Sequence, residues 1–106
     1  MYWAYLFIAG FFETFWAITL KMSHGFSRPI PTILTFIGMA FSFFLLAKAL
    51  KNIPVGTGYA VWTGIGIVGT FLVSVIVFHD SFTLGQGICV FLILSGIIGL
   101  RILSAN

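Results

Sequence analysis

Apolar residues form four long runs along the chain, separated by short polar segments. The runs cover roughly residues 2–20, 31–50, 57–78 and 84–103. A helix needs about 20 apolar residues to cross the hydrocarbon core of a bilayer, so each run is long enough to span it once. The pattern therefore predicts an all-α membrane protein in which residues 1–106 form a single domain of four transmembrane helices.

The composition supports this assignment and argues against a soluble enzyme. Of the 106 residues, 60% are hydrophobic and 7% are charged, and one small water-soluble fold could not bury that much apolar surface. The links between the runs are too short for a nucleotide pocket or a catalytic lobe. We therefore expect membrane lipid around the chain, no enzymatic activity, and no cofactor or metal site.

The basic residues lie where membrane anchors are found. Lys21, Arg28, Lys48, Lys51 and Arg101 all fall at or near the ends of apolar runs, where long basic side chains reach the interface. A nucleic-acid surface would need a basic stretch on one polar face. No such stretch occurs in the sequence, so we expect no nucleic-acid partner.

The same residues give almost no orientation signal. Four spans place Lys48, Lys51 and Arg101 on one side and the other two basic residues on the opposite side, whereas orientation normally follows a clear Lys/Arg excess. A weak bias that still suffices is one interpretation. The other is dual topology, in which two copies inserted in opposite directions pair as an antiparallel homodimer. Small residues in the fourth run suit a close helix contact between the copies, and these are Ser95, Gly96 and Gly99.

Glu13 is the only acid inside an apolar run. An ionisable side chain at that depth costs on the order of 3 kcal/mol even on lenient insertion scales, so it is a candidate for function. The alternative is a protonated glutamic acid that only ties helices together. Ala9, Gly10 and Ala17 share its helical face and are expected to leave open volume beside it. We expect a cavity where Glu13 binds a substrate cation and a proton in turn.

The third run carries a second group of candidates. Tyr59 and Trp62 share a helical face with Gly66 and can offer hydrogen bonds and ring faces to a cation. An interfacial aromatic belt is the alternative and fits Tyr59 better than Trp62. Gly64 and Gly66 weaken the helix in mid-membrane and are expected to permit a bend. In the second run, Ser42 either bonds its own backbone or orients the Glu13 carboxylate.

Taken together, these motifs resemble the small multidrug resistance transporter family over nearly the whole chain. The resemblance is carried by residues 9–13 with Trp16, by Lys21 and residues 25–28, and by residues 54–57 and 59–66. Within the family the chain is similar to the guanidinium exporter subtype, because Trp62, Thr63 and Gly64 stand where quaternary-ammonium pumps typically have Trp-Ser-Gly. The positions that point the same way are Trp16, Ser42, residues 98–100 and Arg101.

The resemblance implies a proton-coupled antiporter that exports guanidinium and related small guanidinyl or cationic compounds. It also implies an antiparallel homodimer in the bacterial inner membrane, with both copies of Glu13 in one shared site. Gly10, Trp16, Ser42, Tyr59 and Trp62 would line that site. Some positions differ from what the family would have there, which leaves the site intact and the breadth of substrates open; they are Gly58, Gly69, Thr70, Phe71 and Cys89.

Three other functions remain as alternatives. A broader quaternary-ammonium exporter would use the same site. A fluoride-type ion channel can also be a small four-span dual-topology dimer rich in phenylalanine, of which this chain has 13, although a carboxylate in the cavity repels anions. An assembly partner that does not transport would use Glu13 only to hold helices in a larger complex.

Overall fold

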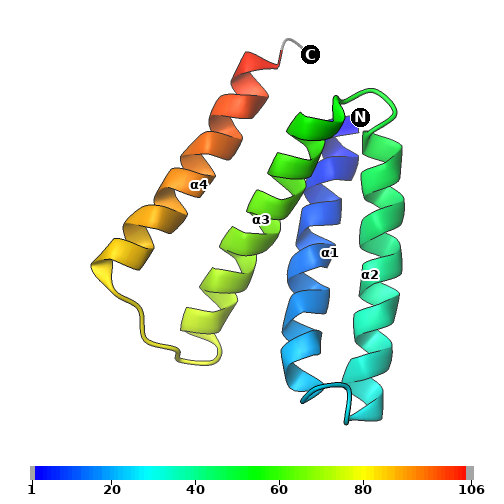
Figure 1. The fold of residues 1–106 in the computed structure, drawn as a ribbon, viewed down its shortest axis with the longest axis vertical. Helices are drawn as coiled ribbons and strands as arrows, with labels where there is room; N and C mark the ends of the chain where they lie inside the picture. The colour runs from blue at the N-terminus through cyan, green and yellow to red at the C-terminus, as the bar shows by residue number, and fades with distance from the viewer. Residues whose placement is uncertain (1, 105–106) are drawn as a thin grey trace.

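The structure, a computed structural model, describes residues 2–104 and contains four long helices (Figure 1). Helix α1 spans Tyr2–Met22, α2 spans Pro29–Ala49, α3 spans Val55–Ile76 and α4 spans Leu84–Leu103. Each helix is long and apolar enough to cross a membrane. The all-α prediction with four membrane-spanning helices is therefore confirmed over the described residues, and each helix begins and ends within two residues of the apolar run that indicated it.

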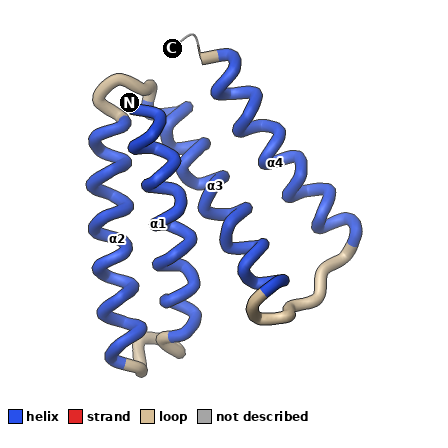
Figure 2. The backbone as a smooth tube through the Cα atoms, turned by 180° about the vertical axis from the view of Figure 1, so that it is seen from behind, coloured by secondary structure: helices blue, strands red, loops and turns tan. Residues whose placement is uncertain are grey.

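Helix α1 lies between α2 and α3, whereas α4 lies beside α3 alone. Figure 2 shows α1 and α2 running side by side, with α3 and α4 tilted relative to them. The start of α1, the α2–α3 turn and the end of α4 lie at one end of the bundle (Figure 1). The α1–α2 and α3–α4 turns lie at the other end.

The small core sits where α1, α2 and α3 meet. Its buried apolar side chains include Leu6, Leu46, Val61 and Trp62, and α4 adds Ile97. Most of the large apolar side chains are exposed on the outside of the bundle. In a membrane protein this surface faces lipid tails, so no second apolar layer is needed to cover it.

The turn between α1 and α2 is tightly determined by its own hydrogen bonds. Three consecutive residues, His24, Gly25 and Phe26, have φ of 49°, 72° and 68°, a left-handed conformation that is unusual for residues other than glycine. Buried Ser23 holds them: its hydroxyl donates to the carbonyl of Leu20 at 2.6 Å and accepts from the backbone N–H of Phe26 at 3.1 Å. The turn thus fixes the direction in which α2 leaves α1.

Two hydroxyl contacts then fix α1 against α2 along their length. The hydroxyls of Thr19 and Thr35, both buried, lie 2.8 Å apart. The hydroxyl of Ser42 donates to the backbone carbonyl of Ala9 at 2.7 Å. These bonds fix the rotation of α1 about its axis and so decide which of its residues point toward α3. Glu13 is one of the residues that point toward α3.

Candidate functional site

Glu13 points from α1 toward α3, where a glycine makes room for it. Its carboxylate lies against Gly66, and a Cβ atom at that position would overlap the carboxyl group. The Oε1 atom is fully covered and has no hydrogen-bond partner within residues 2–104. Buried polar atoms are normally hydrogen-bonded, so this oxygen has an unused capacity to accept a hydrogen bond.

A cavity of about 430 Å³ opens beside this carboxylate. The residues that line it come from α1 and α3 and include several with small or hydroxyl-bearing side chains: Glu13, Ala17, Gly66, Ile67, Thr70, Phe71 and Ser74. Another cavity of about 380 Å³, between α1, α3 and α4, has an apolar lining apart from Arg101 and does not include Glu13. The polar cavity is therefore the candidate site.

Of the three small residues expected to leave open volume, only Ala17 borders this cavity. Gly10 is buried and makes room for a neighbour instead, because a Cβ there would lie 2.6 Å from Cγ2 of Ile65. Ala9 is fully buried, and its carbonyl binds Ser42. Small residues on α1 therefore serve helix packing as well as the cavity, which spacing along one helix does not reveal.

Ser42 links all three helices of the core. It is fully buried, and besides donating to Ala9 it accepts a hydrogen bond from Nε1 of Trp62 at 2.9 Å. Neither alternative from the sequence describes this geometry, since the hydroxyl reaches neither its own backbone nor Glu13. Its observed role is to hold the indole of Trp62 in one orientation against α1. Ser42, Tyr59 and Trp62, expected to line the site, do not border the cavity beside Glu13.

Aromatic rings from three helices form a continuous row, in which Trp62 is buried and Tyr59 and Phe43 are exposed. The ring centroids of Tyr59 and Trp62 are 5.4 Å apart, those of Trp62 and Phe43 are 5.6 Å apart, and those of Phe43 and Trp16 are 6.4 Å apart. The row thus brings together three residues expected at the site. Phe43, which joins them, was missed because nothing distinguishes it in the sequence from twelve other phenylalanines.

Two further buried polar atoms have no partner in the described part of the chain. They are Nε1 of Trp16 and Oγ1 of Thr63. Trp16 was expected at the site, whereas Thr63 was noted only as part of a subtype motif. An indole N–H can only donate, whereas a threonine hydroxyl also accepts. The indole is therefore an unused donor and the hydroxyl an unused donor or acceptor, and neither residue lines the cavity beside Glu13.

The glycines of α3 are used for close packing. Helix α3 is unbroken through Gly64 and Gly66. A Cβ at Gly64 would lie 2.7 Å from Cδ1 of Ile97, so this glycine allows α4 to approach. The bend expected at these two residues stays a prediction.

The residues expected at a contact between copies lie on α4. Ser95 and Gly96 are exposed and Gly99 is half-buried. A Cβ added at Gly96 or Gly99 would meet nothing within 4 Å. This part of α4 is therefore a free surface in the single chain, and its role as a dimer contact stays a prediction.

Four membrane-spanning helices with one half-buried acid beside a polar cavity are the features of a small multi-pass membrane transporter. The family model described as Small Multidrug Resistance protein matches residues 1–93, and the chain belongs to that family. It is thus a transporter of the bacterial inner membrane and not an enzyme, as the resemblance predicted.

Several similar proteins carry the name guanidinium exporter. One from Yersinia pseudotuberculosis serotype I (strain IP32953) is 53% identical over 104 residues, covering 98% of this chain and all of the relative. One from Proteus vulgaris is 45% identical over 104 residues with the same coverage. One from Escherichia coli (strain K12) is 46% identical over 102 residues, covering 96% of this chain and 97% of the relative.

Proposed function

We propose that this chain exports guanidinium and related small guanidinyl cations in exchange for protons, with Glu13 as the group that both ions use. The observation that carries the proposal is the buried, unpartnered Oε1 of Glu13 beside a cavity inside the membrane. The name shared by the similar proteins supports the choice of cation.

Guanidinium chemistry suits the groups around Glu13. A planar N–H fork can bind a carboxylate through two parallel hydrogen bonds, and weak hydration lowers the cost of removing water from the cation. Thr63 has an unused acceptor for a further N–H. Because Ser42 takes up the N–H of Trp62, this indole offers the cation its ring face and no hydrogen bond.

Trp16 has a different role in this proposal. Its unpartnered Nε1–H is a donor, and a donor repels another N–H group, so it does not bind guanidinium directly. It can donate to the carboxylate of Glu13 and hold the group in the orientation that a two-pronged hydrogen bond requires. Trp16 then favours planar cations over round ones.

Competition for one carboxylate gives the exchange. A dry surrounding disfavours a lone negative charge, so Glu13 carries a proton when no cation is bound. A cation that enters displaces the proton, and a returning proton releases the cation. Occupancy by one ion at a time couples the two movements, and inward proton flow then drives export.

The proposal includes an antiparallel homodimer with two copies of Glu13 in one shared site. Two acids would allow two protons to exchange for one singly charged cation. Similar numbers of basic residues at the two ends of the bundle and the free small-residue surface of α4 support this arrangement. Alternating access would follow when the two copies exchange conformations.

Transport by the purified chain in liposomes tests the proposal directly. Guanidinium uptake should be driven by a proton gradient, should move protons in the opposite direction, and should exceed uptake of tetraethylammonium. Equal transport of both cations would favour the broader exporter. Rapid uncoupled fluoride flux would favour the channel, and inactivity without another subunit would favour the assembly partner.

A further inference from the structure

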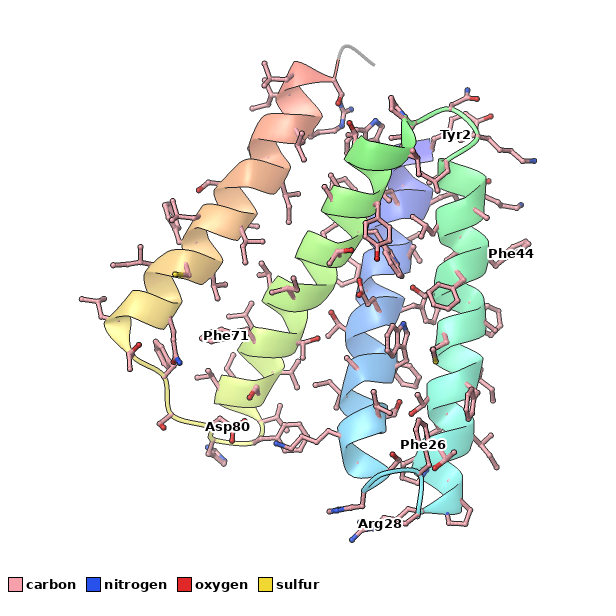
Figure 3. All side chains as sticks on the ribbon, viewed as in Figure 1. Tyr2, Phe26, Arg28, Phe44, Phe71 and Asp80 are labelled. Atoms are coloured by element: carbon pink, nitrogen blue, oxygen red, sulfur yellow. The ribbon has the colours of Figure 1, made fainter. Side chains whose placement is uncertain are left out.

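A second acid lies at the end of the bundle where helix α3 ends. Asp80 belongs to the segment between α3 and α4 (Figure 3). Its carboxylate accepts a hydrogen bond from the hydroxyl of Ser74 and lies 3.9 Å from Nζ of Lys21, with both charged side chains well exposed. Asp80 is thus hydrogen-bonded to the last turns of α3 and is also exposed to water.

Ser74 is part of a line that leads back to Glu13. Gly66, Thr70 and Ser74 recur every four residues and therefore share one face of α3. Gly66 is the residue against which the Glu13 carboxylate lies. At a rise of 1.5 Å per residue, Ser74 is about 12 Å along the helix from Gly66. This face therefore joins the buried acid to the exposed one.

Two adjoining cavities follow this face. The cavity beside Glu13 is bordered by Thr70, Phe71 and Ser74. A second cavity, of about 770 Å³, shares Phe71 and Ser74 with the first and reaches Asp80. Because the two cavities share these lining residues, they lie next to each other along the face that leads from Glu13 to Asp80.

The hydroxyls along this face are not taken up by the backbone. In α1 and α2, threonine hydroxyls donate to carbonyls of their own helix or of the residue just before it, as at Thr14, Thr19, Thr32 and Thr35. In α3, Thr63 also has no partner within residues 2–104. Ser74 instead donates to Asp80, and Thr70 has no side-chain hydrogen bond within residues 2–104. Hydroxyls without a backbone partner inside a membrane are placed to bind water or a cation.

We propose that this face of α3 is a water-lined path by which small cations move between Asp80 and Glu13. The proposal rests on the proposed function and adds an access route to its site. The negative charge of Asp80 raises the local concentration of cations at the mouth, and Thr70 and Ser74 accept hydrogen bonds from N–H groups that have lost part of their water.

Thiol labelling tests whether the path is wet. In a Cys89→Ser background, which removes the native thiol, single cysteines are introduced by Thr70→Cys, by Ser74→Cys and, as a matched control, by Leu72→Cys on another, apolar part of α3. A cationic methanethiosulfonate reagent reacts with the thiolate, which forms readily only in water. We expect both path cysteines to react at least about tenfold faster than the control, and guanidinium to slow both reactions.

The role of Asp80 is tested with the same cysteines. Asp80→Asn should slow the cationic reagent by about threefold and leave a neutral methanethiosulfonate unchanged. Labelling at Thr70→Cys no faster than at Leu72→Cys would show a dry face and overturn the path, even if the chain transports guanidinium. If the cysteines were labelled but guanidinium did not slow the labelling, the proposal that guanidinium uses the path would be overturned. Labelling in a chain that transports nothing would contradict the proposed function and still support the path.

Discussion

Helices α1 and α4 have nearly the same length and are both apolar enough to span a membrane, yet the fold uses them in opposite ways. Helix α1 packs against two neighbours and carries four buried residues, whereas α4 packs against one and buries only Ile97. Thr19 and Glu13 of α1 meet a partner and a cavity inside the bundle, whereas Gly96 and Gly99 of α4 meet open space. Hydropathy identifies both helices as membrane spans, but only packing separates the helix that borders the cavity from the one whose small residues stay free.

The largest effect is expected from Glu13→Gln. The amide keeps the shape of the side chain but can neither carry a proton nor hold a cation by charge, so proton-coupled guanidinium transport in liposomes should fall to background. Elution of the purified variant from a sizing column should stay unchanged. Glu13→Asp should still bind the cation and transport it poorly, because the shorter arm misplaces the carboxylate. Persistent pH-dependent exchange by Glu13→Gln would refute the role of this acid.

Two glycine substitutions compare the packed and the free helix directly. In Gly66→Ala the new methyl group would overlap the Glu13 carboxylate, and such overpacking typically costs about 1–3 kcal/mol, with loss of transport. Gly96→Ala adds the same methyl group in open space and should leave thermal stability in detergent unchanged or raise it by up to about 1 kcal/mol. Equal melting temperatures for the two variants would contradict the packing described for α3.

Trp16→Phe tests selectivity within the site. The change removes an N–H that has no partner in the described chain and that, in the proposed function, donates to the Glu13 carboxylate. A hydrogen bond to a charged group contributes about 1.5–3 kcal/mol, so the affinity of the site for guanidinium should fall about tenfold or more. Tetraethylammonium, which cannot donate hydrogen bonds, should lose less. Trp3→Phe, near the start of α1, is the matched control, and equal losses for both cations would reduce Trp16 to a packing residue.

Gly99→Leu tests the assembly role of α4. A leucine there fits the single chain, where a Cβ meets nothing within 4 Å, but it would hold two copies apart. Helix contacts of this kind contribute about 1 kcal/mol, so dimerisation measured by energy transfer in liposomes should weaken severalfold. Phe91→Leu, at an exposed α4 position without a small residue, should change little. An unaffected dimer would move the contact elsewhere.

The smallest effect on transport is expected from Ser42→Ala. It removes both the bond to the carbonyl of Ala9 and the bond from Nε1 of Trp62, and each interhelical hydrogen bond in a membrane contributes about 0.6–1.7 kcal/mol. The free energy of unfolding should fall by the contribution of these two bonds. Ser95→Ala, on the exposed side of α4, should have no effect. A similar loss in both variants would mean that the Ser42 bond does not stabilise the core.

The helices were predictable because the membrane itself imposes their length. Their ends were less so: α2 begins at Pro29, two residues before its apolar run, because proline is well accepted in the first turn of a helix. Glu13 was also predictable, since the cost of a buried acid marks it without reference to any neighbour. These features depend on one residue or one segment at a time.

The partners of these residues could not be predicted in the same way. The bond between Ser42 and Trp62, the ring of Phe43 and the use of Gly10 by Ile65 all depend on how each helix is rotated about its axis. That rotation results from the packing of three helices together. These helices are apolar around most of their circumference, so amphipathic patterning gives little indication of how each helix is rotated about its axis.

The tight turn at Ser23 has a consequence for how the protein is made. Every contact that joins α1 to α2, including the Thr19–Thr35 pair and the Ser42–Ala9 bond, lies within the first half of the chain. A growing chain emerges N-terminus first, so this hairpin can close in the membrane before α3 is synthesised. Helix α3 would then dock onto the completed surface of the α1–α2 hairpin. The hydroxyl of Ser42 would already be in place on that surface to accept the hydrogen bond from the indole of Trp62.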